Sequence, residues 1–258
     1  MKRIAILTGV TSGMGKEFTY QLDYNLKKID EFWLVGRDLE KLEKVESRMK
    51  NKCRLFVCDL NERTDLKKIM RELYTGKYEI KILVNCAGYG MLGRFVDISY
   101  NDNMGMIDVN CRALVSLTYD CIPFMCRNSR IINVASAAAF VPQPEFAVYA
   151  ASKSFVLSFS RALNAELKDK QIYVTAVCPG PVDTPFFKKA ESYGTTMEIK
   201  KLIMAKPEKV VEKAIKDSIM KKQISVYGVV MNGYKKFARL IPNRYIIEGT
   251  RILNKLKR

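Results

Sequence analysis

Apolar and polar positions follow two different rhythms along this chain. Short runs rich in Ile, Val and Leu alternate with longer stretches in which apolar residues recur every three or four positions. The short runs are typical of buried strands, and the periodic stretches are typical of helices with one buried face. Strands are expected at residues 3–9, 32–36, 53–58, 80–85, 130–135, 172–177 and 224–227. Helices are expected at residues 14–29, 39–50, 64–74, 99–127, 147–169 and 207–221.

Strands that alternate with helices in this way predict an α/β fold. We expect a doubly wound parallel sheet of about seven strands with helices on both faces, in three α/β/α layers. Before the helix expected at 39–50, Asp38 is placed to act as the N-cap. The chain shows no internal repeat and no linker rich in Gly, Ser or Pro. Residues 1–233 are therefore predicted to form one domain, followed by a basic amphipathic extension at 234–258.

A glycine-rich turn joins the first predicted strand to the first predicted helix. Residues 8–15 read Thr-Gly-Val-Thr-Ser-Gly-Met-Gly. Glycines at this place let backbone amides approach a pyrophosphate at the positive end of a helix. The spacing departs from the common Gly-x-Gly-x-x-Gly fingerprint, and a tight strand-to-helix connection would explain it equally well. The dinucleotide contacts predicted in this turn are Gly9, Thr11, Ser12, Gly13, Met14 and Gly15.

The residues after the second predicted strand bear on the choice between NAD and NADP. NAD-selective enzymes tend to carry an acid there for the ribose 2′-hydroxyl, whereas this chain has Gly36 followed by Arg37. A guanidinium suits a 2′-phosphate, so NADP(H) is the expected cofactor and NAD(H) the alternative. A solvated arginine at the strand end is the competing interpretation. Asp38 is the residue that would bind a 2′-hydroxyl instead, but its N-cap position already explains it.

A serine, a tyrosine and a lysine are the second candidate for chemistry. Ser136 ends an apolar run, and Tyr149 and Lys153 share a helix face because residues i and i+4 are neighbours there. An ammonium beside a phenol favours the ionised phenol. From its free pKa of about 10, the phenol would need a shift of roughly 3 units, or about 4 kcal/mol, to be half ionised near neutral pH, and we expect the lysine and the positive ring of a cofactor to supply it together. Tyr24 and Lys28 repeat the spacing without a serine before them, and we expect that pair to be structural.

The composition excludes several other kinds of chemistry. The chain has no histidine, which removes Ser-His-Asp hydrolysis, Cys-His proteolysis and His-ligated metal catalysis. Its seven cysteines form no Cys-x-x-Cys pair, so reduced intracellular thiols and no metal site are expected. The first apolar run stops at Thr8, short of a secretory signal, and no segment reaches the roughly 18 apolar residues of a membrane span. A cytoplasmic protein is predicted.

Together these motifs resemble the short-chain dehydrogenase/reductase family over nearly the whole chain, which implies a Rossmann-like fold. Residues 58–60 (Cys-Asp-Leu) are similar to its adenine-side site, and residues 85–88 (Asn-Cys-Ala-Gly) to the segment that closes the fourth strand over the cofactor. Residues 179–184 look like the turn that holds the nicotinamide carboxamide. The implied cofactor contacts are Asp59, Leu60, Asn85, Ala87, Gly88, Tyr149, Lys153, Pro179, Gly180, Val182 and Thr184. A turn cap at Asp59 and backbone pairing at Asn85 are the alternatives.

The resemblance also implies a mechanism for interconverting a carbonyl and an alcohol. The family's catalytic positions match Asn110, Ser136, Tyr149 and Lys153. In this scheme Ser136 donates a hydrogen bond to the carbonyl, and Tyr149 gives it a proton as hydride arrives from the nicotinamide. Lys153 favours the phenolate and binds the nicotinamide ribose, while Asn110 holds a water that links Lys153 to solvent. Because cellular NADP pools are usually kept reduced, reduction is the expected direction.

The identity of the substrate depends on the segment 184–206, between the nicotinamide turn and the next helix. Its apolar residues predict a lid over a bulky hydrophobic carbonyl compound, contacted by Phe186 and Phe187 together with Ser136 and Tyr149. The other apolar candidates, in this segment and two further loops, are Tyr193, Met197, Leu202, Ile203, Met204, Tyr89, Met91, Leu92, Val141 and Phe146. Packing or oligomer contacts explain the same residues equally well.

The C-terminal segment 234–258 combines charge with apolar residues. It has eight Lys or Arg residues against one acid, Glu248. Such a segment is suited to lie on an anionic membrane surface, or to pack its apolar side on the domain. Many family members have an Asp-Gly-Gly turn near this point, and this chain lacks it after Gly228. That departure weakens an assignment as a 3-oxoacyl-carrier-protein reductase and puts the usual tetramer contacts in doubt.

We therefore predict an NADP(H)-dependent oxidoreductase that reduces a hydrophobic ketone or aldehyde, steroid-like or lipid-like, as a homo-oligomer (dimer or tetramer). Reduction of 3-oxoacyl thioesters is the enzymatic alternative, since acyl-carrier proteins are acidic and the net charge is +17. That charge also permits a sensor of NADP(H) or a nucleic-acid-binding protein. No nucleic-acid motif accompanies it, and a pure sensor would have no use for the catalytic set, so no nucleic-acid partner is expected.

Overall fold

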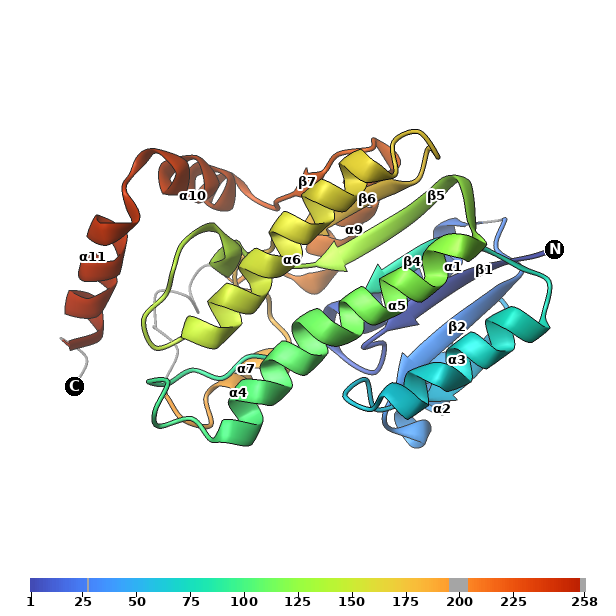
Figure 1. The fold of residues 1–258 in the computed structure, drawn as a ribbon, viewed down its shortest axis with the longest axis horizontal. Coiled ribbons are helices and arrows are strands. Elements are labelled where there is room, and N and C mark those ends of the chain that lie inside the picture. Colours follow the sequence, from blue (N-terminus) through green and yellow to red (C-terminus); the bar gives the residue numbers. More distant parts are fainter. Residues whose placement is uncertain (27, 195–203, 256–258) are drawn as a thin grey trace.

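Seven parallel strands form one sheet in the described residues, which are 1–26, 28–194 and 204–255 of this computed structural model (Figure 1). The strand order is β3-β2-β1-β4-β5-β6-β7. From β1 the chain adds β2 and β3 on one side of the sheet, and it then crosses over to add β4 to β7 on the other side. This confirms the doubly wound α/β fold with about seven strands. The strands are β1 (Lys2–Thr8), β2 (Glu31–Gly36), β3 (Cys53–Val57), β4 (Tyr78–Asn85), β5 (Met125–Val134), β6 (Tyr173–Val177) and β7 (Ile224–Ser225).

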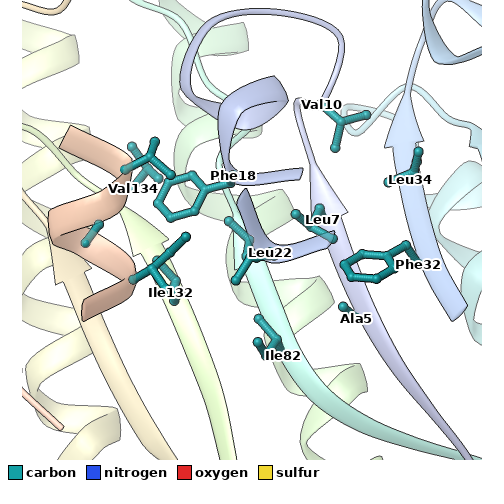
Figure 2. Close-up of a cluster of buried hydrophobic side chains, with 14 of the residues drawn as sticks. Ala5, Leu7, Val10, Phe18, Leu22, Phe32, Leu34, Ile82, Ile132 and Val134 are labelled. Atoms are coloured by element: carbon teal, nitrogen blue, oxygen red, sulfur yellow. The ribbon is translucent and has the colours of Figure 1, made fainter. Parts of the chain in front are cut away.

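Helices cover both faces of the sheet because the strands are apolar on both sides. Ala5 and Leu7 of β1 point to one face, into a core with α1 (Gly13–Asn25), α2 (Leu39–Glu46) and α9 (Pro207–Ile219). Figure 2 shows Phe18 and Leu22 of α1 in this core. The other face packs against three further helices. These are α3 (Arg63–Thr75), α5 (Leu114–Cys121) and α6 (Ala147–Glu166).

The prediction of a single helix over residues 99–127 is wrong, because the segment is not one continuous α-helix and its helical part ends before residue 127. The segment is divided into α4 (Tyr100–Ile107), a π-helical turn (Asp108–Ala113) and α5, and a 3-10 turn (Ile122–Phe124) ends it. Pro123 in that last turn has no backbone N–H to donate, so the α-helix does not continue. Strand β5 begins directly afterwards, at Met125 rather than at residue 130.

Two helices at the C-terminus lie outside the three layers (Figure 1). The last strand ends at Ser225 rather than at residue 227, and Gly228 precedes α10 (Val229–Leu240) with φ +84°. Helix α11 (Asn243–Lys255) follows. The boundary expected after residue 233 falls inside α10, so the predicted extension shares a helix with the end of the predicted domain. The predicted lid, residues 184–206, contains a short helix, α7 (Phe186–Ala190).

Candidate active site

Two adjoining cavities open at the carboxyl edge of the parallel strands, where ligands bind in folds of this kind. One is lined by the glycine-rich turn after β1 and has a volume of about 310 Å³. The other is lined mostly by apolar side chains and has a volume of about 420 Å³. They share a border formed by Met14, Cys86, Gly88, Thr184 and Phe186.

The first cavity gathers the residues predicted to hold a dinucleotide. Gly9 and Gly13 have φ of +69° and +51°, the region that favours glycine. At Gly15, a Cβ would lie 2.1 Å from the carbonyl oxygen of Gly9, so only glycine fits the turn. Of the predicted contacts, this cavity is lined by Gly9, Thr11, Ser12, Gly13, Met14, Gly15, Arg37, Asp59, Leu60, Ala87, Gly88 and Thr184.

The Thr8 side chain ties the glycine-rich turn to the loop after β4. Its hydroxyl oxygen accepts hydrogen bonds from the backbone N–H groups of Cys86 and Ala87, both at 3.1 Å. The two segments that enclose the middle of the cavity are thus held together by one buried side chain. Thr8 is a positioning residue that the sequence pattern did not single out.

A second cation accompanies Arg37 in the first cavity. Lys189, on α7, also lines it, and its ammonium lies 3.8 Å from the centroid of the Tyr89 ring. Burial lowers the pKa of Lys189, and the charge of Arg37 lowers it further. No ion pair to Arg37 or Lys189 is found among the described residues. Lys189 was not predicted from the sequence, because its place depends on how α7 packs against the loop after β4.

Two predicted cofactor residues have side chains engaged within the protein. The carboxylate of Asp59 accepts a hydrogen bond from the backbone N–H of Asn61 at 2.9 Å, so it caps a turn while lining the cavity. The Asn85 side chain donates to Thr118 Oγ1 at 3.0 Å and to Asn133 Oδ1 at 2.9 Å. Asn85 is buried and lines neither cavity, and its side chain bonds to other side chains inside the core rather than to the backbone groups that the alternative named.

The second cavity brings together the predicted reaction centre and the predicted nicotinamide turn. Ser136, Tyr149 and Lys153 line one part of it, although they come from the end of β5 and from α6. Pro179, Gly180 and Val182 line another part, next to Phe186 and Phe187. The remaining apolar wall consists of Val134, Ala135, Ala137, Ala138, Val141, Phe146, Pro181, Met231, Tyr234 and Ile246.

The Tyr149 ring is held on several sides. It stacks on Phe146 with centroids 4.3 Å apart and contacts Phe186 at 5.5 Å. A Cβ at Gly90 would lie 2.5 Å from the ring, so the loop after β4 also packs closely against it. Ser136 Oγ accepts a hydrogen bond from the backbone N–H of Ala138 at 3.1 Å, and Ser136 also hydrogen-bonds Tyr149. The phenol is therefore fixed beside Ser136 at the cavity wall.

Burial sets the protonation of the tyrosine and the lysine. It raises the pKa of Tyr149 to about 12, although the hydrogen bond with Ser136 acts in the opposite direction. It lowers the pKa of Lys153 to about 8. The ammonium donates to the carbonyl oxygen of Val134 at 2.8 Å and lies 5.7 Å from the Tyr149 ring centroid. The protein's own groups therefore keep Tyr149 protonated near neutral pH. The expected shift of Tyr149 toward ionisation relied on the positive nicotinamide ring as well as on Lys153, and it stays a prediction.

Asn110 lies behind the reaction centre, in the π-helical turn. Its Nδ2 donates to the Tyr89 carbonyl at 2.9 Å and to Ser152 Oγ at 3.0 Å, and its Oδ1 accepts from the Tyr89 N–H at 3.0 Å. Both amide hydrogens are thus used within the protein. A water between Asn110 and Lys153 remains a prediction, and it would have to bind an acceptor oxygen of Asn110.

The predicted substrate loops divide between lining and packing. Val141, Phe146, Phe186 and Phe187 line the apolar cavity as predicted. Met91 and Leu92 are buried in a hydrophobic cluster behind this cavity. Tyr89 lines the first cavity, next to the glycine-rich turn, instead. Tyr193 and Met204 line neither cavity, and the Tyr193 hydroxyl donates to Asp102 Oδ2 at 2.9 Å. Met197, Leu202 and Ile203 lie outside the described residues.

The tyrosine and lysine that repeat the catalytic spacing do not form a second site, as expected. Tyr24 is exposed, and α1 ends at Asn25, so Tyr24 and Lys28 do not share a helix face. The C-terminal helices contribute four cavity residues that were not predicted from the sequence, Met231 and Tyr234 from α10 and Ile246 and Thr250 from α11. Only their amphipathic spacing signalled a buried side, and it did not indicate what that side covers.

Comparison with known proteins gives a consistent picture. A family model described as short chain dehydrogenase matches residues 3–193. A very-long-chain 3-oxoacyl-CoA reductase of Anas platyrhynchos is 34% identical over 194 residues, which cover 71% of this chain and 61% of that protein. A 17-beta-hydroxysteroid dehydrogenase type 3 of Mus musculus is 32% identical over 198 residues, covering 73% of this chain and 63% of that protein. A short-chain dehydrogenase from Sphingobium yanoikuyae in complex with NADPH superposes with a TM-score of 0.76 at 23% identity, over 94% of this chain and 97% of that one.

Proposed function

This chain belongs to the short-chain dehydrogenase/reductase family of NAD(P)-dependent oxidoreductases, and we propose that it is an NADPH-dependent reductase of hydrophobic ketones, steroid-like or lipid-like. One observation carries the proposal. Ser136, Tyr149 and Lys153 line a mostly apolar cavity. This cavity borders a second one that is lined by glycines and by the cationic side chains of Arg37 and Lys189. A reducible carbonyl and a phosphorylated dinucleotide are the ligands that such a pair of cavities would hold together.

The cofactor-side cavity fits a dinucleotide. The positive-φ glycines and the start of α1 offer backbone N–H groups to a pyrophosphate. A Cβ at Gly88 would lie 2.8 Å from Asn110 Oδ1 and 3.2 Å from Lys153 Nζ, so glycine keeps this border narrow but open. At the other end, Arg37 and Lys189 would bind a ribose 2′-phosphate, which supports NADP(H) over NAD(H).

The protein's own side chains would then hold the substrate carbonyl and supply the proton that its oxygen takes up. The bound nicotinamide supplies a hydride when the carbonyl is reduced. The Ser136 hydroxyl would hold the carbonyl oxygen, and Tyr149 Oη would give it a proton. Because the raised pKa keeps Tyr149 protonated, this arrangement supports reduction as the working direction. Lys153 would bind the nicotinamide ribose from its place on the same wall.

The apolar cavity supports a hydrophobic substrate. Val141, Phe146, Phe186 and Phe187 would contact it, joined by residues of the C-terminal helices. The volume of about 420 Å³ lies in the range of small-molecule sites.

The second candidate is a 3-oxoacyl thioester reductase, because one of the relatives is named as a very-long-chain 3-oxoacyl-CoA reductase. Homo-oligomer formation stays a prediction.

The test is NADPH oxidation by the purified full chain across steroid ketones, other hydrophobic ketones, aldehydes, and 3-oxoacyl thioesters of coenzyme A and of acyl-carrier protein. We expect the highest kcat/KM with a free hydrophobic ketone, and turnover with NADPH in preference to NADH. A Phe187→Ser variant should lose activity toward that ketone while keeping activity toward a small water-soluble aldehyde. Turnover of thioesters only would establish the second candidate. NADPH binding without turnover of any compound would refute both.

A further inference from the structure

The two C-terminal helices have a side that faces the apolar cavity and a side that faces away from the domain. Met231 and Tyr234 of α10, with Ile246 and Thr250 of α11, line the cavity. The Tyr234 ring also lies 6.3 Å from the Phe140 ring, next to the reaction centre loop. These contacts fix which side of each helix is covered.

The outward side of α10 carries a stripe of large apolar residues. At 3.6 residues per turn, the four residues of this stripe fall within an arc of about 100° on the helix, and the covered residues Met231 and Tyr234 lie outside that arc. The residues are Val229, Val230, Phe237 and Leu240, whose exposed fractions are 90%, 64%, 51% and 82%. Tyr245 and Ile252 form a similar exposed pair on α11. Nothing in the described residues covers this outer stripe, which is unusual for a helix of a globular domain.

The charge around the stripe is strongly positive. Segment 234–258 has eight Lys or Arg residues and one acid. That acid, Glu248, is already engaged with Arg251 at 2.9 Å. Lys236 lies on the flank of the α10 stripe and is exposed, whereas Lys235 lies on the opposite side of the helix, toward the domain. An exposed apolar stripe on a segment with this excess of positive charge is suited to a surface that is apolar below and anionic above.

We propose that α10 and α11 dock this protein on the surface of an anionic phospholipid bilayer, with Val229, Val230, Phe237 and Leu240 inserted among the acyl chains. A second copy of the chain would bring the same positive charge against this surface, whereas anionic headgroups have the complementary sign. In the described residues, no helix is long and apolar enough to cross a bilayer, so the contact is peripheral. That the docked surface also delivers a lipophilic carbonyl to the cavity rests on the proposed function.

The experiment is vesicle flotation of the full chain. We use vesicles of phosphatidylcholine, and vesicles of phosphatidylcholine and phosphatidylglycerol in equal parts, at low and high salt. We expect binding to the mixed vesicles, reduced by salt because headgroup attraction is screened. The double variant Phe237→Glu with Leu240→Glu should lower the partition coefficient by about tenfold or more. Tyr24→Glu, which changes an equally exposed apolar residue on α1, is the matched control and should bind as the wild type does.

Two further readouts keep the outcomes separate. Lys236→Glu changes only charge and should weaken binding to the mixed vesicles in the same direction. Activity without vesicles toward a water-soluble carbonyl should be the same in the double variant, because these residues do not line the cavity. Vesicle binding by an inactive wild type would refute the proposed function and leave the docking intact. Equal binding by the double variant would overturn the docking. So would sedimentation velocity showing a dimer that the double variant dissociates.

Discussion

The side chain of Asn110 pairs with both backbone groups of Tyr89, donating to its carbonyl at 2.9 Å and accepting from its N–H at 3.0 Å. Asn110 lies in a π-helical turn, where the helix widens locally, and π turns often occur at functional sites. Tyr89 follows Gly88, which borders both cavities. One buried amide therefore sets the path of the loop between the two cavities, and the π-helical turn that interrupts the predicted long helix positions this amide.

Replacing Asn110 tests that relationship. Asn110→Ala would leave the N–H and the carbonyl of Tyr89 without their partner, and each unsatisfied buried group destabilises a protein by about 1–3 kcal/mol. For the two groups together, we expect the free energy of unfolding in urea to fall by about 2–6 kcal/mol and kcat to fall as well. Unchanged stability together with unchanged kcat would show that the loop does not depend on Asn110.

A methyl group at position 88 should disturb the reaction centre directly. Gly88→Ala places a Cβ 2.8 Å from Asn110 Oδ1 and 3.2 Å from Lys153 Nζ, closer than ordinary van der Waals contacts. We expect weaker NADPH binding in fluorescence titration and lower kcat. Gly233→Ala is the matched control, because a Cβ there meets no atom within 4 Å. If both variants bind and turn over as the wild type does, the border between the cavities is wider than these distances indicate.

Cofactor preference should depend on two cations. A hydrogen bond to a charged group contributes about 1.5–3 kcal/mol, so Arg37→Ala and Lys189→Met should each raise the Kd for NADPH by about 10- to 100-fold. The Kd for NADH, which lacks the 2′-phosphate, should change little. Lys50→Met removes a similar lysine, whose ammonium lies 4.3 Å from the Tyr24 ring centroid, and serves as the control. A parallel loss of NADH affinity would assign Arg37 or Lys189 to another part of the dinucleotide.

The pKa values give the sign of the pH dependence. Burial lowers the pKa of Lys153 to about 8 and raises that of Tyr149 to about 12, so both are protonated below pH 8 and Lys153 loses its proton first. We expect kcat/KM for carbonyl reduction to be level below about pH 8 and to fall by about tenfold per pH unit above it. Initial rates from neutral to alkaline pH would measure this. A level profile up to about pH 10 would show that the charge of Lys153 is not required.

Much of this structure follows from local pattern. The strands are predicted well because a parallel sheet covered on both faces requires continuous apolar runs. The site residues are predicted because strand ends meet at one edge, which brings Gly13, Arg37, Ser136 and Thr184 to adjoining cavities. These positions depend on the order of elements more than on any single contact.

What the sequence did not predict depends on contacts between distant segments. Lys189 lines the glycine-lined cavity because of where α7 packs, and Met231 lines the apolar cavity because of where α10 packs. The π-helical turn around Asn110 has no distinctive residue pattern. The pKa of Tyr149 was predicted from Lys153 and a bound nicotinamide ring, and the effect of burial, which is the largest among the protein's own groups, depends on packing that the sequence does not show.

The most direct test of the account is NADPH oxidation with a hydrophobic ketone by wild type and by Tyr149→Phe, with NADPH binding measured in parallel. Phenylalanine keeps the contacts of the ring with Phe146 and Phe186 and removes only the hydroxyl. We predict unchanged NADPH binding and a loss of kcat of about 10²- to 10⁴-fold, the usual contribution of a general acid. Turnover by Tyr149→Phe at the wild-type rate would contradict the central claim that Tyr149 donates the proton.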